Sequence, residues 1–539
     1  MTTINRVFTV EGRPFFTVGG QARNSSGYSD AESETAFKAV KLLHGNTLEI
    51  PVYWDQVEPQ EGRFDWTSVD ALLASARRYG VKLVLLWFAT WKNGNMDYAP
   101  AWVKANPQRF KRVVSSNGKS VWVLSSHCQA NLEADRKAFV AFCEHLKARD
   151  SVEHTVIAIQ IENEPGILGS DRDYGPEAQA EFEAPVPAEL VARMKATGAG
   201  RVYELWQQAG GKRSGSWPKM FGWAAGEVMT AWSIATYIDR LAEAGKAIHD
   251  LPMYINVWLG EQGWVFPGET YPSGGAVSKV LDIYKWFTPH IDLIAPDIYI
   301  ADSRGYEAIC AAYAREDNPL FVPESAPGGS NVWNMYRAIA DYNAVGYHFF
   351  AIEHIVGEDG SVRPELQPIV DSIRSVAAVA PLLLKYQGTG KIHALIQEEN
   401  LGSQRLDLDG YVGLAEFGDG LPSYVFKDWR HQSGRMPFGA PADDKRGRGL
   451  VIQASQNELY LVGAHYRLIL RPLLPPELRD PSQGSSYMFS RQVGYIRADE
   501  GHLDEQGQFI VDRQRNGDEI SSGLWVEPDN GVLRVILCD

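Results

Sequence analysis

The sequence predicts an α/β chain in which a (β/α)8 TIM barrel precedes a smaller all-β, sandwich-like domain. Up to about residue 380, short apolar runs alternate with helical patterns, which is typical of parallel strands joined by helices. From residue 381 onward, short strand-like runs alternate with turn residues, as in an antiparallel sandwich. We therefore expect a catalytic barrel over residues 1–380 and a β-rich domain over residues 381–539.

The predicted barrel strands are short apolar runs, because both faces of a parallel barrel strand are covered. Eight parallel strands with right-handed helical crossovers close into a barrel. The eight predicted strands are Phe15–Gly20, Asn46–Tyr53, Lys82–Trp87, Thr155–Ile161, Met253–Trp258, Leu293–Tyr299, Pro319–Val322 and Val345–Ala351.

The connection after the fourth predicted strand is long. It covers residues 167–222, whereas connections in βα units are commonly about 2–6 residues. Because it leaves the C-terminal end of a strand, we expect it to lie over the site as a lid or subsite wall. An oligomer contact is the alternative, and the chain is expected to form a homo-oligomer such as a dimer.

The second domain shows no motif that carries chemistry. We expect it to stabilise the barrel, to form an oligomer interface or to shape the substrate entrance. Its predicted strands, separated by turns such as Asp529-Asn-Gly531, are Lys391–Gln397, Tyr411–Phe417, Leu450–Gln453, Leu459–Ala464, Tyr495–Arg497 and Val532–Leu537.

The 539 residues carry a net charge of -15, which argues against nucleic acids and anionic membranes as main partners. No apolar run approaches the roughly 18 residues of a membrane-spanning helix. The first residues lack the basic and apolar regions of a signal peptide. The chain as given is therefore expected in the cytoplasm, or in the periplasm or outside the cell if it is a trimmed form.

The four cysteines form no Cys-x-x-Cys pair and no cluster with histidine. A structural zinc site is therefore not expected. No other metal and no organic cofactor is expected either.

Two predicted strands run directly into glutamates. The apolar run Ile157–Ile161 leads to Glu162, Asn163 and Glu164, and a shorter run leads to Glu324. Barrel enzymes gather their catalytic residues at these strand ends. Two carboxyl groups can cleave a glycosidic bond, one as proton donor and the other as nucleophile or base. Strand alternation leaves the choice between Glu162 and Glu164 open, because both would lie on one side.

Three motifs carry a resemblance to known enzymes. Gln160-Ile-Glu-Asn-Glu164, together with Glu324, resembles glycoside hydrolase family 35, in the clan whose barrels carry glutamates on strands four and seven. The segment Val52–Trp66 is similar to the Trp…Glu-Pro…Glu-Gly…Phe-Asp pattern of families 35 and 42. Leu86–Gly94 and Tyr98–Trp102 resemble a bacterial branch of family 35 with a C-terminal β domain.

This resemblance implies that Glu164 is the proton donor, that Glu324 is the nucleophile and that Asn163 binds the sugar 2-hydroxyl. It implies an exo-acting, retaining β-galactosidase that releases terminal β-linked galactose from oligo- or polysaccharides by double displacement. Many members of the family have tyrosine where this chain has Pro165. The subfamily, the linkage and the natural aglycone therefore stay open.

Other residues near the strand ends are candidate substrate contacts. Tyr299 is also placed to donate a hydrogen bond to Glu324 and keep it ionised. Barrel packing is the alternative for the aromatic residues, and an ion pair is the alternative for Glu353. Asp297 is expected to order the site or to pair with an arginine. The substrate-contact candidates are Tyr53, Trp91, Asn93, Trp258, Tyr299 and Glu353.

Other functions remain open from the sequence. The enzyme alternatives within the clan are a β-galactosidase of family 42 type, a β-D-fucosidase and an α-L-arabinopyranosidase. A non-catalytic carbohydrate-binding barrel is the alternative from another class of protein. A metal-dependent barrel hydrolase is disfavoured, because no cluster of histidine and aspartate ligands is visible.

Overall fold

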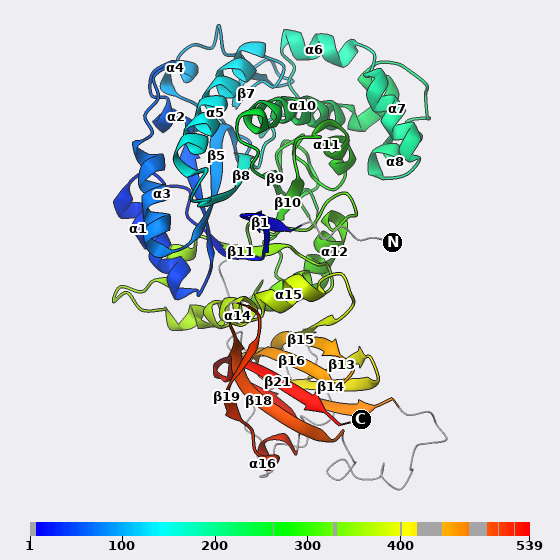
Figure 1. Ribbon diagram of the computed structural model, residues 1–539. Helices are drawn as coiled ribbons and strands as arrows, with labels where there is room; N and C mark the ends of the chain where they lie inside the picture. Colours follow the sequence, from blue (N-terminus) through cyan, green and yellow to red (C-terminus); the bar gives the residue numbers. More distant parts are fainter. Residues whose placement is uncertain are drawn as a thin grey trace.

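The chain forms a barrel surrounded by helices, with a β-rich part packed against one side of it (Figure 1). The structure is a computed structural model that describes residues 7–261, 263–326, 331–398, 402–417, 445–473, 493–504, 506–521 and 523–538. The helices α14 (Gln367–Ala378) and α15 (Ala380–Tyr386) lie where the two parts meet. The boundary predicted after residue 380 falls at the start of α15 and stays a prediction.

Seven parallel strands form the barrel sheet, in the order β10-β9-β8-β5-β4-β3-β11. Seven of the eight predicted strands are present, and the third continues to Lys92 instead of ending at Trp87. The bounds are β3 (Thr17–Gln21), β4 (Thr47–Tyr53), β5 (Lys82–Lys92), β8 (Val156–Asn163), β9 (Met253–Trp258), β10 (Leu293–Asp297) and β11 (Gly346–Phe350).

The predicted strand Pro319–Val322 occupies the expected place but is not a regular strand. Val322 forms an isolated bridge with β11, and Ser325 forms one with the residue after β10. Pro319 begins the segment and Pro323 follows it. Proline has no N–H to donate to a β-ladder. The segment nevertheless spans the gap between the two edge strands and completes the barrel.

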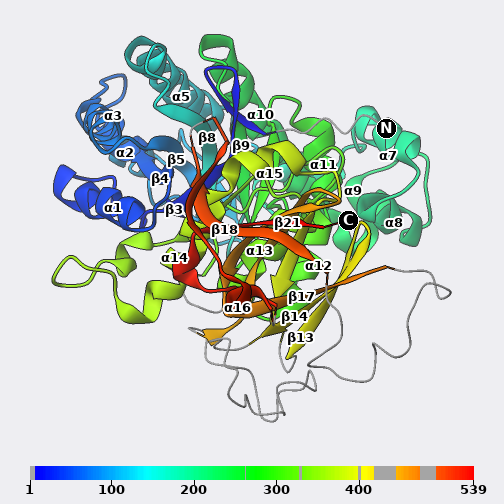
Figure 2. The ribbon, with the colours of Figure 1, turned by 60° about the horizontal axis from the view of Figure 1, so that its bottom comes forward.

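Helices cover the outside of the sheet, and short elements fill the connections (Figures 1 and 2). The helices are α1 (Asp30–Leu42), α2 (Trp54–Val57), α3 (Thr67–Tyr79), α4 (Ala101–Lys104), α5 (Gln129–Asp150), α10 (Ala225–Ile248), α11 (Leu281–Phe287), α12 (Ser303–Tyr313) and α13 (Val332–Ala340); a further hairpin is formed by β6 (Arg112–Val114) and β7 (Ser120–Leu124).

The end of the barrel opposite the strand tips is closed by a hairpin of β1 (Phe8–Val10) and β2 (Arg13–Phe15). Phe8 packs edge-on against Phe321, with 5.3 Å between the ring centroids. It joins an apolar cluster with Leu293 at the start of β10. Among the described residues, this end of the barrel is therefore filled with apolar side chains.

A buried polar chain crosses the middle of the barrel. Glu49 on β4 accepts a hydrogen bond from the Tyr254 hydroxyl and pairs with Nδ1 of His348. Nε2 of His348 lies 2.7 Å from the Thr17 hydroxyl. Glu49 and His348 are fully buried, and a buried carboxylate needs such partners.

The long connection of residues 167–222 is largely helical. It contains α6 (Pro176–Glu183), α7 (Ala188–Thr197), α8 (Arg201–Gln208) and α9 (Trp217–Phe221). α9 contacts α10, whereas α7 and α8 contact α11, so this region lies beside the barrel helices (Figure 1). Its action as a lid stays a prediction.

The C-terminal part contains two antiparallel sheets that share an apolar core. All six predicted strands are present there. One sheet holds β12 (Ile392–Ile396), β15 (Arg448–Ser455), β16 (Glu458–Ala464), β18 (Tyr495–Leu503), β19 (Phe509–Gln514) and β21 (Val532–Leu537); the other holds β13 (Ser403–Leu408), β14 (Tyr411–Phe417), β17 (Tyr466–Pro472) and β20 (Leu524–Val526), with α16 (Gly517–Ile520) beside β20.

The two parts are joined by packing and by buried arginines. Arg448 of β15 is almost fully buried, and its Nε donates to the Ser372 hydroxyl of α14 at 2.8 Å. Arg446 stacks on the Trp333 ring of α13, with 3.6 Å between its Cζ and the ring centroid.

Within the described residues, no single helix is long and apolar enough to cross a membrane. By length and composition, α14 with the turn before it could do so only together with α15, and the two are bent by 58°.

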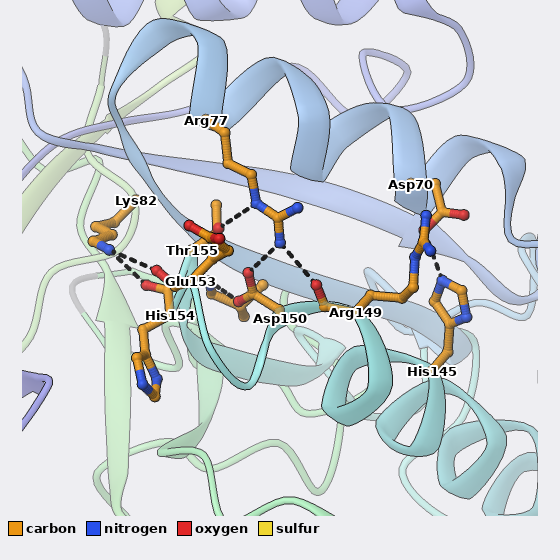
Figure 3. A network of polar contacts seen from close by, with 10 residues as sticks. Asp70, Arg77, Lys82, His145, Arg149, Asp150, Glu153, His154 and Thr155 are labelled. Atoms are coloured by element: carbon orange, nitrogen blue, oxygen red, sulfur yellow. Dashed lines mark hydrogen bonds and ion pairs between the residues drawn. The ribbon is translucent and has the colours of Figure 1, made fainter.

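Polar contacts fasten α3 and α5 to the first residue of β8, at the end of the barrel away from the strand tips (Figure 3). Arg77 of α3 donates to Asp150 Oδ1 at 2.8 Å and to Thr155 Oγ1 at 3.0 Å. Asp150 Oδ2 accepts from the backbone N–H of Val156 at 2.7 Å. One buried carboxylate thus fixes the start of the strand that carries Glu164.

We expect Asp150→Ala to lower the free energy of unfolding by about 1–3 kcal/mol, because it leaves a buried N–H without a partner. Asp70→Ala is the matched control. Asp70 pairs with His145 and Arg149 on a partly exposed surface, where an ion pair contributes about 0–1 kcal/mol. Urea unfolding, monitored by tryptophan fluorescence, measures the free energy of unfolding of the two variants. Equal losses in the two variants would contradict the anchoring role of Asp150.

Candidate active site

A cavity of about 280 Å³ lies at the strand-tip end of the barrel. This volume is close to the lower end of the roughly 300–1,000 Å³ that is usual for small-molecule sites. The residues that line it follow the ends of several different strands: Asn24, Lys92, Asn93, Glu164, Trp258, Leu259, Trp264, Asp297, Tyr299, Glu324 and Phe350.

The backbone at the end of β8 separates its two glutamates. Glu162 and Glu164 have positive φ angles of 61° and 44°, which are uncommon for residues other than glycine. The strand alternation is therefore broken, and Glu164 lines the cavity while Glu162 does not. The backbone N–H of Glu164 donates to Asn256 Oδ1 at 2.8 Å. Such strained residues persist only where their surroundings hold them.

Glu162 belongs to a buried acidic pair outside the cavity. It accepts from the Trp91 backbone N–H at 2.7 Å and hydrogen-bonds Asp135. Asp135 in turn accepts from Thr90 Oγ1 at 2.6 Å and from Trp87 Nε1 at 3.0 Å. Burial and the neighbouring Asp135 raise the pKa of Glu162 well above its usual range. Two carboxyl groups that hydrogen-bond each other hold a proton between them. Because Glu162 bonds Asp135 and the Trp91 backbone, it supports the end of the strand and does not face the cavity.

Glu324 is held by two donors. Gln21 Nε2 donates to Oε1 and the Tyr299 hydroxyl donates to Oε2, each at 2.6 Å. Burial raises the pKa of Glu324, whereas attraction to Lys92 and these two hydrogen bonds oppose the rise. The structure therefore contains the hydrogen bond that was predicted for Tyr299, and the donors favour the ionised form of Glu324.

The electrostatic environment of Glu164 differs from that of Glu324. Burial and repulsion by Glu324 raise the pKa of Glu164 to about 7, and Lys92 opposes this rise. A carboxyl group with this pKa is partly protonated at neutral pH. Two neighbouring carboxyl groups with such different environments are suited to separate acid and nucleophile roles.

Lys92 was not identified from the sequence. It is the last residue of β5, is 7% exposed and donates to the side chain of Asn93. Burial lowers the pKa of Lys92, while Glu164 and Glu324 oppose that change. The available signal was a charged residue at the end of a long apolar run, but the strand was predicted to end five residues earlier.

Three predicted contacts, Asn93, Trp258 and Tyr299, line the cavity, but Tyr53 and Trp91 do not. The Tyr53 hydroxyl donates to the Asn24 carbonyl at 2.7 Å, so it holds the loop that carries a lining residue. Trp91 is fully buried and packs edge-on against the Tyr237 ring. Tyr53 and Trp91 therefore pack within the barrel and do not line the cavity.

Glu353 also lies away from the cavity. Its carboxylate accepts from the Arg23 backbone N–H at 3.0 and 3.1 Å and from the Ser26 hydroxyl, and it lies 3.8 Å from Arg23 Nε. The ion-pair alternative is therefore the correct one, because these contacts occupy both carboxylate oxygens. Glu353 secures the loop between β3 and α1.

Asn163 is fully buried and does not line the cavity either. Its Oδ1 accepts from Gln160 and Asn256 at 3.2 and 3.3 Å, and its Nδ2 donates to Asn93 at 3.4 Å. In this arrangement Asn163 contacts Asn93, which lines the cavity. Its binding of a sugar hydroxyl stays a prediction.

The remaining lining residues lie at the end of a strand or in the loop that follows one. Asn24 follows β3, Leu259 and Trp264 follow β9, and Phe350 ends β11. Their residue types carry no distinctive chemistry, so only the position of each loop could have indicated them. Among the described residues, no group of three or more histidine, cysteine or acidic side chains is arranged to hold a metal ion.

Comparison with known proteins identifies two segments. Residues 27–199 match a family model described as β-galactosidase, that of glycoside hydrolase family 42, and residues 372–527 match a domain of unknown function, DUF5597. A β-galactosidase of Xanthomonas manihotis is 28% identical over 176 residues, which are 31% of this chain and 26% of that relative. The match thus spans about a quarter of the relative's length.

One solved structure supports the barrel fold, and a second is reported for comparison only. The catalytic domain of a β-amylase from Paenibacillus polymyxa is 14% identical, with a TM-score of 0.50 over 67% of this chain and 98% of the other. A β-galactosidase from Bacillus circulans sp. alkalophilus is 14% identical, with a TM-score of 0.48 over 70% of this chain and 57% of the other.

Part of the barrel, residues 27–199, is similar to glycoside hydrolases of the β-galactosidase type. The family model that matches is that of family 42, so the resemblance to family 35 gains no support, whereas the glycosidase clan does.

The acidic pair of Glu162 and Asp135 predicts a pH effect on stability. Because the folded-state pKa of Glu162 lies above its ordinary value of 4.5, the pair stabilises the fold fully at low pH. This contribution is lost as the pH rises through the folded-state pKa. Glu162→Gln mimics the protonated acid, so we expect a smaller loss of stability as the pH is raised from the ordinary pKa of 4.5 to about pH 9.

Thermal unfolding over this pH range tests the expectation. Glu61→Gln is the control, because Glu61 lies at the surface with Arg109 as its partner. It should leave the pH dependence unchanged. Parallel curves for wild type and Glu162→Gln would show that the pair carries no extra proton.

Proposed function

We propose that the chain is an exo-acting, retaining β-galactosidase that releases terminal β-linked galactose. The observation that carries the proposal is the placement of Glu164 and Glu324 in one cavity, where repulsion by Glu324 adds to the rise in the Glu164 pKa and two hydrogen bonds oppose the rise in the Glu324 pKa. The pKa of about 7 for Glu164 suits a proton donor. The two hydrogen bonds to Glu324 suit a nucleophile that must stay ionised.

In the proposed first step, Glu164 donates its proton to the glycosidic oxygen while a carboxylate oxygen of Glu324 attacks the anomeric carbon. The glycosidic bond breaks, the aglycone leaves as an alcohol, and an ester joins the sugar to Glu324. Forming the ester removes the charge of Glu324. The pKa of Glu164 should then fall, because repulsion by that charge was one cause of its elevation.

In the second step, Glu164 accepts a proton from water, whose oxygen attacks the anomeric carbon. The ester bond breaks, Glu324 regains its carboxylate, and Glu164 is protonated for the next cycle. Two inversions at one carbon give net retention. Each cycle consumes one glycoside and one water, and both carboxyl groups are regenerated.

The exo action and the sugar preference rest on different grounds. A cavity of about 280 Å³ suits one sugar ring better than an extended chain. The preference for galactose is supported by the match of residues 27–199 to a β-galactosidase family model. The natural aglycone is not specified by either observation.

Turnover of p-nitrophenyl β-D-galactopyranoside tests the proposal. We expect wild type to cleave it and Glu324→Gln to lose at least about 10⁴-fold in kcat, since its carboxylate is the nucleophile. Added azide should partly restore Glu164→Gln and give β-galactosyl azide, because a small anion needs no general base. Glu61→Gln, a matched change at the surface beside Arg109, is the control for substitution as such.

Three outcomes would contradict the proposal. Turnover of only the fucoside or arabinopyranoside would move the sugar preference within the clan. An α-configured azide product would exclude retention. Binding of galactose by a protein that cleaves no glycoside would favour the non-catalytic alternative.

Tyr299→Phe should weaken the ionised form of Glu324, because it removes one of two donors. We expect the acidic limb of the pH profile of kcat/KM to move to higher pH by roughly one unit, with a loss of about ten-fold below that limb. Steady-state rates between pH 4 and 9 provide the measurement. A change in KM alone would indicate that Tyr299 contacts only the sugar.

A further inference from the structure

We propose that Lys92 is a specificity-determining residue whose side-chain ammonium group donates a hydrogen bond to a hydroxyl group of the terminal sugar. This role deepens the proposed function and rests on it, since the sugar is the one that Glu164 and Glu324 would release. Of the described residues that line the cavity, Lys92 is the basic one, and the two-step mechanism leaves it unused.

A tight turn fixes the end of β5 at the cavity. Lys92 and Asn95 exchange two backbone hydrogen bonds, at 2.8 and 3.0 Å. Asn93 and Gly94 between them have positive φ angles of 52° and 68°, as in the type I′ turns that favour Asn-Gly. The Asn93 backbone N–H donates to the Asn163 carbonyl at 3.0 Å. The turn is therefore tied to the end of β8, and the backbone of Lys92 is held on both sides.

The side chain of Lys92 is directed into the barrel. Its Nζ lies 5.0 Å from the centroid of the Phe88 ring, and Phe88 belongs to the same apolar cluster as Phe8. Lys92 is almost fully buried in the protein and lines the cavity. A ligand that fills the cavity therefore meets this side chain.

The ammonium group has more hydrogens than the protein uses. A lysine ammonium offers three N–H donors, and Lys92 donates one to Asn93 Oδ1. That oxygen also accepts from Asn163 Nδ2 at 3.4 Å. Among the described residues, no second hydrogen-bond acceptor contacts Nζ. Because a buried donor without a partner is costly, this arrangement favours a ligand that supplies the acceptor.

Three acids share the cavity with Lys92 but do not touch it. Glu164, Glu324 and Asp297 line the cavity, and attraction to them opposes the fall in the pKa of Lys92 that burial causes. In the part of the chain that the structure describes, none of them forms an ion pair with Lys92, for which the two atoms would lie within about 4 Å. A hydroxyl group accepts and donates at once, so a sugar hydroxyl fits between the ammonium group and a carboxylate.

The same acids restrict the chemistry of the ligand. Like charges placed together disfavour binding, so the carboxyl groups disfavour a uronate and Lys92 disfavours an amino sugar. The arginine partner predicted for Asp297 is wrong: its Oδ2 accepts from Asn256 Nδ2 at 2.8 Å, and among the described residues no arginine contacts it. The ligand that fits is therefore a neutral sugar with free hydroxyl groups.

Substrates that lack one hydroxyl group test the contact. Wild type, Lys92→Met and Lys92→Arg are compared on p-nitrophenyl β-D-galactopyranoside and on its 2-, 3-, 4- and 6-deoxy analogues, each variant at its own pH optimum. A hydrogen bond from a charged donor is worth about ten- to hundred-fold, so wild type should lose this factor in kcat/KM on one analogue. Lys92→Met should lose it already on the parent sugar and show little further loss on that analogue.

Two further variants sharpen the comparison. Lys92→Arg keeps the charge but displaces the donors, so its discrimination against that analogue should fall while its pH profile stays close to that of wild type. Lys82→Met is the matched control, because Lys82 lies at the opposite end of β5 and donates to the His154 carbonyl at 2.7 Å. It should discriminate among the sugars as wild type does.

Unchanged discrimination in both Lys92 variants would overturn the inference and leave Lys92 as a charge that only balances the acids. Failure of both variants to fold would assign Lys92 a structural role and would overturn the inference as well.

A binding measurement separates this inference from the proposed function. Calorimetry with D-galactose should show about ten-fold or greater weakening in Lys92→Met and none in Lys82→Met. Equal affinities, tighter binding of D-galacturonate, or no binding of D-galactose by wild type would overturn the role of Lys92. Inactivity of wild type on every glycoside, with galactose binding that still depends on Lys92, would contradict the proposed function alone.

Discussion

The burial of several carboxyl groups around one lysine ammonium is the constraint on which the site depends. A buried charge is tolerated only when it is paired or hydrogen-bonded. Glu324 meets this requirement with two donors and the field of Lys92, and Glu164 meets it by being partly protonated. The same constraint explains why the polar residues lie at the strand tips, where the sheet ends and side chains from separate strands can meet.

The geometry of the site is fixed by the scaffold beneath it. Glu164 and Glu324 lie on segments that are far apart in the sequence, and only the barrel brings them into one cavity. Positive φ angles at the end of β8 turn Glu164 toward that cavity and leave Glu162 in the buried pair with Asp135. The hydrogen bond that the Glu164 backbone N–H donates to Asn256 Oδ1 holds this backbone in place. The position of Glu164 therefore depends on a neutral, buried side chain that does not line the cavity.

The strands were predictable because both faces of a barrel strand are covered, which leaves a continuous apolar run in the sequence. The seventh predicted strand is irregular because Pro319 and Pro323 donate no N–H to a ladder. Lys92 was not identified because β5 is five residues longer than predicted. The hydrogen bond from Tyr299 could be anticipated from its place at a strand end. The separation of Glu162 from Glu164 could not, because alternation predicts one shared side and a positive φ at glutamate leaves no mark in the sequence. Glu353 carries the right chemistry for a sugar contact, but only the fold shows that Arg23 and Ser26 already occupy it.

The most direct test of the account is the identification of the residue that becomes covalently bound to sugar. A 2-deoxy-2-fluoro-β-galactosyl fluoride should form the ester quickly and lose it slowly, because fluorine at C2 destabilises the positive charge that develops at the anomeric carbon. Mass spectrometry of the intact protein and of its peptides should show one fluorogalactosyl group, on the peptide with Glu324. An adduct on another residue, or rapid turnover of galactosides with no trapped adduct, would contradict the assignment of the nucleophile.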